Sequence, residues 1–441
     1  MKYIDFVVQI EMRVSIHNHA YDLSDFARTH PGGRDILETA SQMEDATPLF
    51  ESYHSLADLG TIKKIAGMYR LDDNVVKTSP EYTYDPSGFY DVVRNRVRDN
   101  YFNNAQFDTK ATWWWAAKVS LLLMFSVMVL YGLFTGNTTW VEQFWRGCVI
   151  GMCHVSVGFN VMHDASHCAI SKRANINEIL SRITNATLLW NHHIWARHHV
   201  YAHHSFTGEI THDPDTKNSR PFLRKSREDP IVKYVPGCVR NQTRLVIPVL
   251  CGIPGQFFGQ TLVYAMSLCK GRVWGVPIDT EMVFQKIDSI TYLVTLGFHA
   301  YVLWNFPVFT IGYYACANTL YYMCIAPDHD TYENSVRDHT PEDGSRDWGE
   351  LQVRRSANFG VPSRVVSELF GGINYQIEHH LFPGVNHVHY PYISPIVKLT
   401  CKEYDIPYNT FTWEDAMRSC FQTYEHGSRI ESDSNTPTDQ A

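Results

Sequence analysis

The chain has 441 residues and a formal net charge of −8, with 44% apolar and 19% charged residues, and it holds 22 histidines and ten cysteines. The apolar fraction excludes a largely disordered chain, and the negative charge argues against a nucleic-acid partner bound through bulk positive charge. Without any Cys-x-x-Cys pair, the cysteines argue against a disulfide framework or a thiolate zinc site and favour a reducing compartment. The first thirty residues lack a basic start followed by an uninterrupted apolar run, so we expect no cleavable signal peptide.

The N-terminal region, about residues 8–72, predicts a small soluble unit with a heme site. It contains the tetrapeptide His-Pro-Gly-Gly beginning at His30, and His54 follows 24 residues later. A six-coordinate heme iron can take two neutral imidazoles on opposite faces. The Pro-Gly-Gly turn lets the backbone approach a flat ring closely. We therefore expect His30 and His54 to hold a heme.

Residues 73–112 are expected to form a polar linker that contains one amphipathic helix. Beyond this linker, four apolar stretches predict membrane spans. About 20 apolar residues are needed to cross the hydrocarbon core of a bilayer. The four stretches are residues 113–134, 144–162, 290–306 and 308–326. The alternative for each pair is a helical hairpin buried in a soluble core. A fifth stretch, 246–268, contains two prolines and two glutamines and is expected to lie in the membrane interface.

Three histidine clusters lie near the edges of these apolar stretches. They are His163-Asp164-Ala165-Ser166-His167, the segment that contains His199, His203 and His204, and Gln376-Ile377-Glu378-His379-His380. Residues four apart share one face of a helix, which is the spacing of His163 with His167 and of His199 with His203. Imidazole suits iron, zinc and copper, and so many imidazoles exceed the four ligands of one zinc and fit two metals. The sequence has no His-Glu-x-x-His motif, so it does not support a zinc protease of that type.

These motifs carry a resemblance to known families. The segment with His-Pro-Gly-Gly resembles cytochrome b5. Together with the boxes HDASH, HxxxHH and QIEHH, it makes the chain similar to the front-end membrane fatty acid desaturases that carry an N-terminal cytochrome b5 domain. The similarity runs from about residue 8 to residue 410. The DPD at 213–215 and the LFPG at 381–384 also resemble that family, and glutamine at the start of the third box is typical of its front-end group.

The resemblance implies a two-part fold. We expect an α+β cytochrome b5-like domain at 8–72, followed by an all-α integral membrane desaturase domain at 113–410. That second domain would have about four transmembrane helices and a cytosolic cap that carries the histidine boxes. Residues 411–441 would be a C-terminal tail, polar and disordered from about Ser428.

The resemblance also implies the site residues and cofactors. It places heme b on His30 and His54, two non-heme irons on the histidine boxes, and O2 as co-substrate. His329 is the best candidate for one further iron ligand, and Gln376 is either a weak ligand or a residue behind the ligands. His198 stands where the family often has glutamine and is not expected to ligate. The implied catalytic residues are His163, His167, His199, His203, His204, Gln376, His379 and His380, and the implied metal ligands are His163, His167, His199, His203, His204, His329, His379 and His380.

The order of the boxes along the chain constrains the topology. All ligands must meet on one side of the membrane, so an even number of crossings must separate His204 from His379. Three apolar stretches lie between them, so the stretch at 246–268 is expected not to cross. The loop at 135–143 has no Lys or Arg, whereas the segment from box one to residue 245 has many. By the positive-inside rule the heme domain and the boxes should face the cytosol. The resemblance implies that the membrane is that of the endoplasmic reticulum.

The resemblance implies a front-end desaturase that inserts a cis double bond into a polyunsaturated fatty acyl chain. Its substrates would be O2 and a fatty acyl lipid or acyl-CoA, with NADH–cytochrome b5 reductase as electron donor and no nucleic-acid partner. A fatty acyl hydroxylase, an acetylenase or a sphingoid-base desaturase on the same scaffold is the nearest alternative. The alternative from a different functional class is a membrane-anchored heme protein that only carries electrons and whose histidine clusters are inert.

Overall fold

In the computed structural model, the first described segment forms a three-stranded antiparallel sheet packed with short helices. β1 (Arg13–Ile16) pairs with β2 (His19–Asp22), which pairs with β3 (Arg70–Val75). Helices α1 (Arg34–Ala40), α2 (Thr47–Tyr53) and α3 (Leu59–Gly67) lie between β2 and β3 in the chain. The structure describes residues 12–75, 82–103, 108–218, 220, 223–227, 229–250, 262, 265–266, 269–273, 276–277, 285–335, 346–361 and 363–429.

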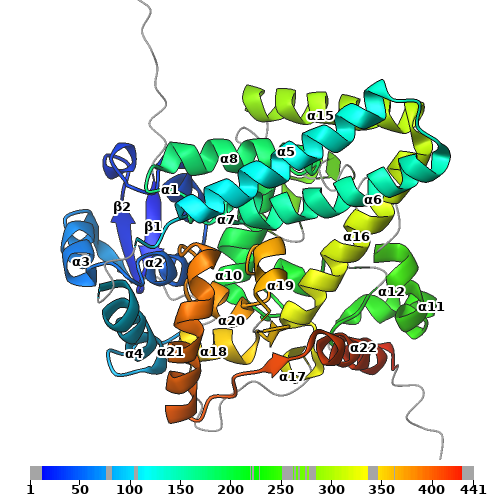
Figure 1. The fold of residues 1–441 in the computed structure, drawn as a ribbon. Coiled ribbons are helices and arrows are strands. Elements are labelled where there is room, and N and C mark those ends of the chain that lie inside the picture. Colours follow the sequence, from blue (N-terminus) through cyan, green and yellow to red (C-terminus); the bar gives the residue numbers. More distant parts are fainter. Residues whose placement is uncertain are drawn as a thin grey trace, which may run out of the picture.

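The core of this N-terminal unit is shared with the helical unit that follows. Val14 and Ile16 are buried on one face of β1, as expected from the two-residue period of a strand, and pack with residues such as Leu37. Val200 and Tyr201 of the helical unit complete the same cluster. Figure 1 shows the two units side by side, and the expected order of an α+β unit followed by a helical unit is confirmed.

The predicted linker contains the expected amphipathic helix, but that helix is packed into the helical unit. α4 (Phe89–Val97) continues into η2 (Arg98–Asn103), a stretch of wider π-helical turns. It packs against α21 (Tyr390–Glu403) and α18 (Trp348–Arg354). Val93 and Val97 of α4 are fully buried, so this part of the chain is a structural element of the core.

Four long helices occupy the four apolar stretches: α5 (Trp113–Thr135), α6 (Trp140–Val157), α15 (Lys286–Asn305) and α16 (Pro307–His329). Among the described residues, α5 alone is both long and apolar enough to cross a membrane. Charged and polar positions lower the hydropathy of the other three helices, so the expectation of four spans is not confirmed. α12 (Gln242–Leu250) covers the start of the stretch at 246–268. Most of the rest of that stretch lies outside the described residues.

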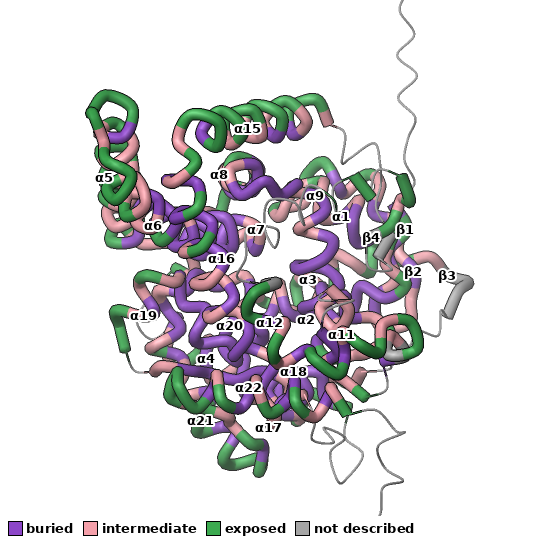
Figure 2. The backbone as a smooth tube through the Cα atoms, turned by 90° about the vertical axis from the view of Figure 1, so that its right-hand side faces the viewer, coloured by how far each residue is buried: buried purple, intermediate pink, exposed green. Residues whose placement is uncertain are grey.

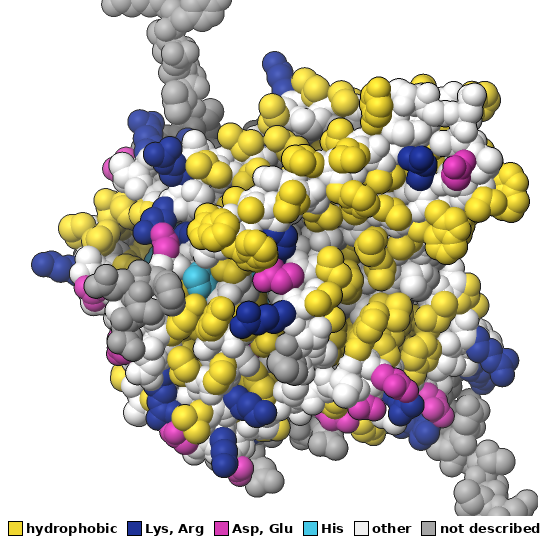
Figure 3. All heavy atoms as spheres, in the orientation of Figure 1, with side chains coloured by type: hydrophobic (Ala, Val, Ile, Leu, Met, Phe, Trp, Pro, Cys, Tyr) yellow, Lys and Arg dark blue, Asp and Glu magenta, His cyan; other side chains and the backbone are white. Residues whose placement is uncertain are grey.

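The long helices expose an apolar surface. Figure 2 shows that α5 and α15 are largely exposed, whereas α16 is largely buried, and Figure 3 shows apolar side chains spread over this half of the molecule. An exposed apolar surface of this extent marks contact with a membrane or a partner. Its exposed large side chains include Leu121, Met124, Met128 and Tyr131 on α5 and Ile290, Leu293, Val294 and Trp304 on α15.

Helices α6 and α16 meet with their backbones in contact at glycines. A Cβ atom at Gly147 would lie 2.1 Å from the Phe309 carbonyl oxygen, and one at Gly312 would lie 2.2 Å from the Phe144 carbonyl oxygen. Small residues permit this close approach, which gives helices extensive van der Waals contact where burial of apolar surface contributes little.

The packed unit extends beyond the boundary expected at residue 410. β7 (Thr410–Phe411) pairs in parallel with β6 (Asn358–Phe359), and α22 (Trp413–Ser428) packs on α12 and α16. Ala416, Cys420 and Tyr424 are four residues apart and fully buried on one face of α22. That helical period explains why this part of the expected tail is folded. Residues 430–441 lie outside the described residues.

The remaining described elements are shorter. They are η1 (Phe26–Arg28), η3 (Gly158–His163), α7 (Asp164–Ser166), α8 (Ala174–Thr187), α9 (His192–Trp195), η4 (Ala196–His203), α10 (His204–Phe206), η5 (Pro214–Thr216), η6 (Pro230–Lys233), α11 (Pro236–Arg240), β4 (Arg272–Val273), β5 (Val276–Pro277), α17 (Tyr332–Ser335), α19 (Arg364–Leu369), α20 (Gln376–Leu381) and η8 (His387–His389).

A buried ion pair fastens the N-terminal unit to α4. The Glu51 carboxylate on α2 accepts a hydrogen bond of 2.6 Å from Arg94 and one of 2.7 Å from His17, and its side chain is 1% exposed. Burial alone raises the pKa of Glu51, but the bonds from His17 and Arg94 outweigh burial and lower the pKa to about 2. The bonds to the ionised Glu51 therefore stabilise the folded protein fully above the unfolded-state pKa of about 4.3. This stabilisation is lost as the pH falls toward 2.

We expect Gly147→Ala to destabilise the protein by about 1–3 kcal/mol, because the added methyl group has to separate α6 from α16. Gly297→Ala is the matched control, since a Cβ at Gly297 on α15 meets nothing within 4 Å. The midpoint of thermal unfolding of the detergent-solubilised variants measures both effects. Equal midpoints for the two variants would contradict the backbone contact.

We expect Arg94→Ala to destabilise the protein by about 3 kcal/mol, because it leaves the buried Glu51 carboxylate short of a partner. The control is Arg418→Ala, whose exposed pair with Glu414 contributes about 0.5 kcal/mol. Denaturant unfolding, monitored by limited proteolysis between the two units, measures the difference in stability between the two variants. An Arg94→Ala protein as stable as the control would show that the pair does not fasten the units.

Candidate metal and heme sites

Two of the three histidine boxes lie at π-helical turns. Box one begins at His163, the last residue of the π-helical η3, and His199 and His203 of box two lie on η4, which is π-helical over residues 196–203. Box three lies on α20. π-helical turns are rare and occur mainly at functional sites, because the extra residue turns neighbouring side chains toward a common point.

One set of four buried imidazoles joins all three boxes. His163, His167, His199 and His379 each offer a nitrogen, and these atoms lie within 4.8 Å of one another. The Nε2 atoms of His163 and His199 are 3.1 Å apart. Four nitrogens converging at this distance form a tetradentate neutral site for one metal ion.

A second set lies beside the first. His203, His329 and His380 offer nitrogens within 4.8 Å of one another, and the Nε2 atoms of His203 and His329 are 3.2 Å apart. The ring of His204 lies between the sets. It stacks on His380 with ring centres 4.2 Å apart, and its Nε2 is 3.4 Å from the Nε2 of His199.

The spacing of box two predicts that His199 and His203 share one face, and their rings lie 5.5 Å apart and nearly parallel. Each belongs to a different imidazole set, and together with Asp215 they form a third group whose ligand atoms lie within 4.8 Å of one another. His329, the further candidate, lies in the second set.

Gln376 reaches the centre of the second set. Its amide Nε2 is 3.0 Å from the Nε2 of His329 and 3.1 Å from the Nε2 of His380. Its Oε1 atom is buried and has no hydrogen-bond partner. The two ends of an amide are assigned from their contacts, and here the amide group points at the place where the imidazoles converge.

The outer nitrogens of five of these imidazoles are held by neighbouring groups. Such partners fix the ring and leave the inner nitrogen free for a metal. The Nε2 atoms of His167 and His379 are buried without a partner, as expected of donors aimed at a metal. The Nδ1 contacts are His167 with the Tyr53 hydroxyl at 2.7 Å, His379 with the Tyr390 hydroxyl at 3.1 Å, His329 with the Arg355 carbonyl at 2.8 Å, His380 with the Gln352 Oε1 at 2.9 Å and His203 with the Asp213 Oδ1 at 3.1 Å.

Burial keeps most of these histidines neutral. It holds the pKa of His167, His199, His204, His379 and His380 well below the ordinary value. Neutral imidazole is the form that binds a metal. The donor set therefore fits two metal ions that accept nitrogen ligands.

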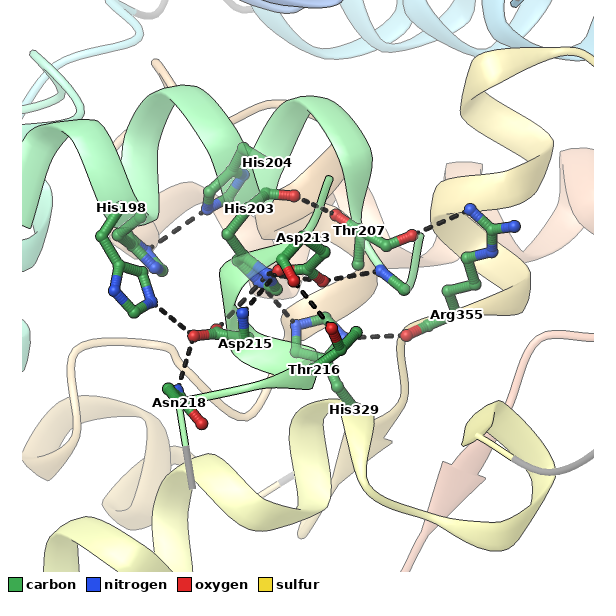
Figure 4. A network of polar contacts seen from close by, with 12 residues as sticks. His198, His203, His204, Thr207, Asp213, Asp215, Thr216, Asn218, His329 and Arg355 are labelled. Atoms are coloured by element: carbon green, nitrogen blue, oxygen red, sulfur yellow. Dashed lines mark hydrogen bonds and ion pairs between the residues drawn. The ribbon is translucent and has the colours of Figure 1, made fainter. Parts of the chain in front are cut away.

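Acidic residues behind box two were assigned no ligand-orienting role from the sequence. Figure 4 shows Asp213 and Asp215 beside His203, with Asp213 also accepting from the backbone N–H of Gly208 at 2.7 Å. Burial alone lowers the pKa of His203, but the charges of Asp213 and Asp215 outweigh burial and raise it. His198 contacts Asp215 at 2.5 Å and belongs to neither imidazole set.

Asp164 contacts a histidine that belongs to neither imidazole set. Its Oδ2 contacts His387 Nδ1 at 2.6 Å and accepts from Asn386 Nδ2 at 2.7 Å. His387 Nε2 in turn lies 3.2 Å from Lys118 Nζ on α5. This chain of contacts ties box one to the loop after box three.

In the N-terminal unit, His30 and His54 face each other. Their ring centres are 6.4 Å apart, which leaves room for a metal with a bond of about 2 Å on either side. His54 Nδ1 contacts the Phe50 carbonyl at 2.7 Å and His30 Nδ1 contacts the Gly33 carbonyl at 3.3 Å, so each Nε2 is left for the metal. A Cβ at Gly32 would lie 2.9 Å from His30, so only glycine fits beside this ring. The pair fits a heme.

Comparison with known proteins gives matches over both units. The family described as "Fatty acid desaturase" matches residues 138–412, and the "Cytochrome b5-like Heme/Steroid binding domain" matches residues 10–78. An "Acyl-lipid (8-3)-desaturase" of Physcomitrium patens is 29% identical over 435 residues, covering 92% of this chain and 86% of that protein. An "Acyl-lipid (8-3)-desaturase" of Mortierella alpina is 25% identical, with 90% and 89% covered. The "Delta(8)-fatty-acid desaturase 2" of Arabidopsis thaliana is 24% identical, with 97% and 92% covered.

We expect Asp213→Asn to weaken metal binding by about 10- to 100-fold, because the neutral amide no longer holds His203 through a charged acceptor. The control is Asp108→Asn, the same change at a surface pair with Lys172. Non-heme metal per heme, measured after dialysis against a series of chelator concentrations, reports the effect. Equal retention in the two variants would contradict the orienting role.

Proposed function

The chain belongs to the fatty acid desaturase family and carries a cytochrome b5-like domain at its N-terminus, and on this premise we propose that it is a front-end acyl desaturase with its own electron donor. The reaction converts a –CH2–CH2– unit of a polyunsaturated acyl chain, O2, two electrons and two protons into a cis –CH=CH– unit and two waters. The observation that carries the proposal is the pair of converging imidazole sets next to a bis-histidine heme site.

The proposed metal is iron in both imidazole sets. When bound, a pair of non-heme irons supplies the O2-dependent chemistry that removes two hydrogens from an unactivated acyl chain. We assign His163, His167, His199 and His379 to one iron. His203, His329 and His380 serve the other, and His204, between the sets, completes the ligand shell. Gln376 lies at the second iron as a neutral group in place of a further imidazole.

The residues around the ligands fix them before the substrate arrives. Asp213, Tyr390, Gln352 and the Arg355 carbonyl each occupy one outer nitrogen, so these four rings keep their inner nitrogens directed at the site. Burial excludes water from the reacting region, which prevents unproductive loss of a reactive oxidant. The polar groups around the site hold the metal ligands. The acyl chain itself requires an apolar channel.

The proposed placement is in the membrane with the histidine boxes in the cytosol. The exposed apolar faces of α5 and α15 support four crossings by α5, α6, α15 and α16, with residues 246–268 in the interface. Lys and Arg residues after box one support the cytosolic orientation. The endoplasmic reticulum is the proposed membrane, because there a cytosolic NADH–cytochrome b5 reductase reaches the heme.

The names of the relatives guide the choice of substrate. Both (8-3) and Delta(8) acyl desaturases occur among them, and others are named for the Delta(5) position. We therefore propose a polyunsaturated acyl chain on a lipid or on coenzyme A, with the new bond on the carboxyl side of the existing ones.

We expect yeast that expresses the wild type to form a more unsaturated acid from a fed panel of C18 and C20 polyunsaturated acids, and His379→Ala to form none. His426→Ala, which changes a histidine of α22 outside both imidazole sets, is the matched control and should keep the activity. Fatty acid profiles by gas chromatography and mass spectrometry measure the products and locate the double bond.

A hydroxylated product from the wild type would replace the proposal with a hydroxylase on the same scaffold. A new double bond in a sphingoid base would replace it with a sphingoid-base desaturase. Two non-heme irons per heme in the purified protein are expected. A heme without any non-heme iron would instead indicate an electron carrier.

A further inference from the structure

One side chain connects the heme site to the imidazole cluster. Tyr53 is the last residue of α2 and directly precedes His54 in the chain. Its hydroxyl lies 2.7 Å from the Nδ1 of His167 in box one, 114 residues further along the chain. The two rings are nearly parallel, at 14° with centres 6.3 Å apart. A residue bonded covalently to one predicted ligand therefore makes a hydrogen bond to another.

The two histidines at the ends of this link face opposite ways. His54 turns its Nε2 toward His30, because its Nδ1 is held by the Phe50 carbonyl at 2.7 Å. His167 turns its Nε2 into the first imidazole set, where that atom is buried and unpartnered. The route from one site to the other runs through one peptide bond, the Tyr53 side chain and one hydrogen bond.

The position of Tyr53 is fixed from several sides. Glu51, two residues earlier, is held by Arg94, and the Tyr90 hydroxyl contacts the carbonyls of Glu51 and Leu381 at 3.4 and 3.3 Å. Gly384, after box three, lies in van der Waals range of the Tyr53 ring, since a Cβ there would be 3.6 Å from it. The contact with His167 therefore belongs to the docked arrangement of the two units.

We propose that Tyr53 is the electron-transfer contact between the heme domain and the di-iron site, an inference that rests on the proposed function. Reduced heme loses one electron and becomes ferric, and one ferric iron of the di-iron site gains that electron. The electron passes through the His54–Tyr53 segment and across the hydrogen bond to His167. Tyr53 keeps its proton and is not oxidised. Two such transfers supply the two electrons of each turnover.

In a purely structural role, the Tyr53 hydroxyl would do no more than hold the ring of His167. The two roles can be separated by an electron source that bypasses the heme. An electron supplied directly to the iron by a small reductant does not need the route through Tyr53, but it does need a correctly placed His167.

The experiment uses the full-length protein loaded with heme and iron in lipid nanodiscs. The heme is reduced without oxygen, the protein is mixed with O2 and the acyl substrate identified in yeast, and heme oxidation is followed by its visible absorbance. The rate of the iron-free protein is subtracted as the background reaction with O2. We expect Tyr53→Phe to oxidise its heme on the order of tenfold more slowly, since rates of reaction between fixed centres depend steeply on their contact.

The matched control is Tyr201→Phe, which removes a hydroxyl at the same contact between the units, beside Thr39. It should oxidise its heme at the wild-type rate. Heme and iron content should be equal in all three proteins. With dithionite and a small mediator as the electron source, Tyr53→Phe should form product as fast as the wild type.

Heme oxidation at the wild-type rate in Tyr53→Phe would overturn the inference. So would a loss of iron, or an equal loss of product with dithionite, because either result would assign Tyr53 a structural role at His167. A wild-type protein that forms no product with either electron source would instead overturn the proposed function. The two failures are therefore distinguishable.

Discussion

The convergence of neutral imidazoles in a dry interior is the constraint on which the rest of this structure depends. Imidazole nitrogens that lie about 3 Å from one another without a metal gain little interaction free energy. The burial of so many polar rings also carries a desolvation cost. The surrounding elements offset part of that cost by occupying the outer nitrogens of five of the rings. Helices from distant parts of the chain must therefore arrive at fixed angles, and the π-helical turns of η3 and η4 supply two of those angles.

The same constraint explains the division of the molecule into two halves. Metal ligands and their acidic partners need polar neighbours, whereas an acyl substrate needs an apolar path. The exposed apolar helices α5 and α15 therefore lie in one half of the molecule, while α6 continues through η3 to His163 and α16 ends at His329. The glycine contact at Gly147 and Gly312 lets those two helices run close together toward the site.

Much of the site could be predicted from the sequence, because histidine clusters are rare and their spacing is local. His30 with His54, and the three boxes, could be read directly from motifs. Tyr53 could not be predicted, because its contact with His167 depends on how two separately folded units dock. The contact of Asp164 with His387 could not be predicted either, since the two residues lie 223 positions apart in the chain. The π-helical turns of η3 and η4 leave no signal in hydrophobic periodicity. The buried face of α22 is visible as a four-residue period, but it is short and lies in a polar sequence.

The clamp formed by Glu51 and Arg94 has a consequence for the timing of catalysis. A donor fastened to its acceptor works at a high effective concentration, so dilution of the protein in the membrane does not slow the internal step. One heme stores one electron, whereas each double bond consumes two, so the donor has to be recharged once within every catalytic cycle. The interval between the two deliveries is then governed by the encounter of an external electron source with the heme domain. Catalysis therefore responds to the supply of that external source, and the stoichiometry of donor to acceptor is fixed at one to one by the chain itself.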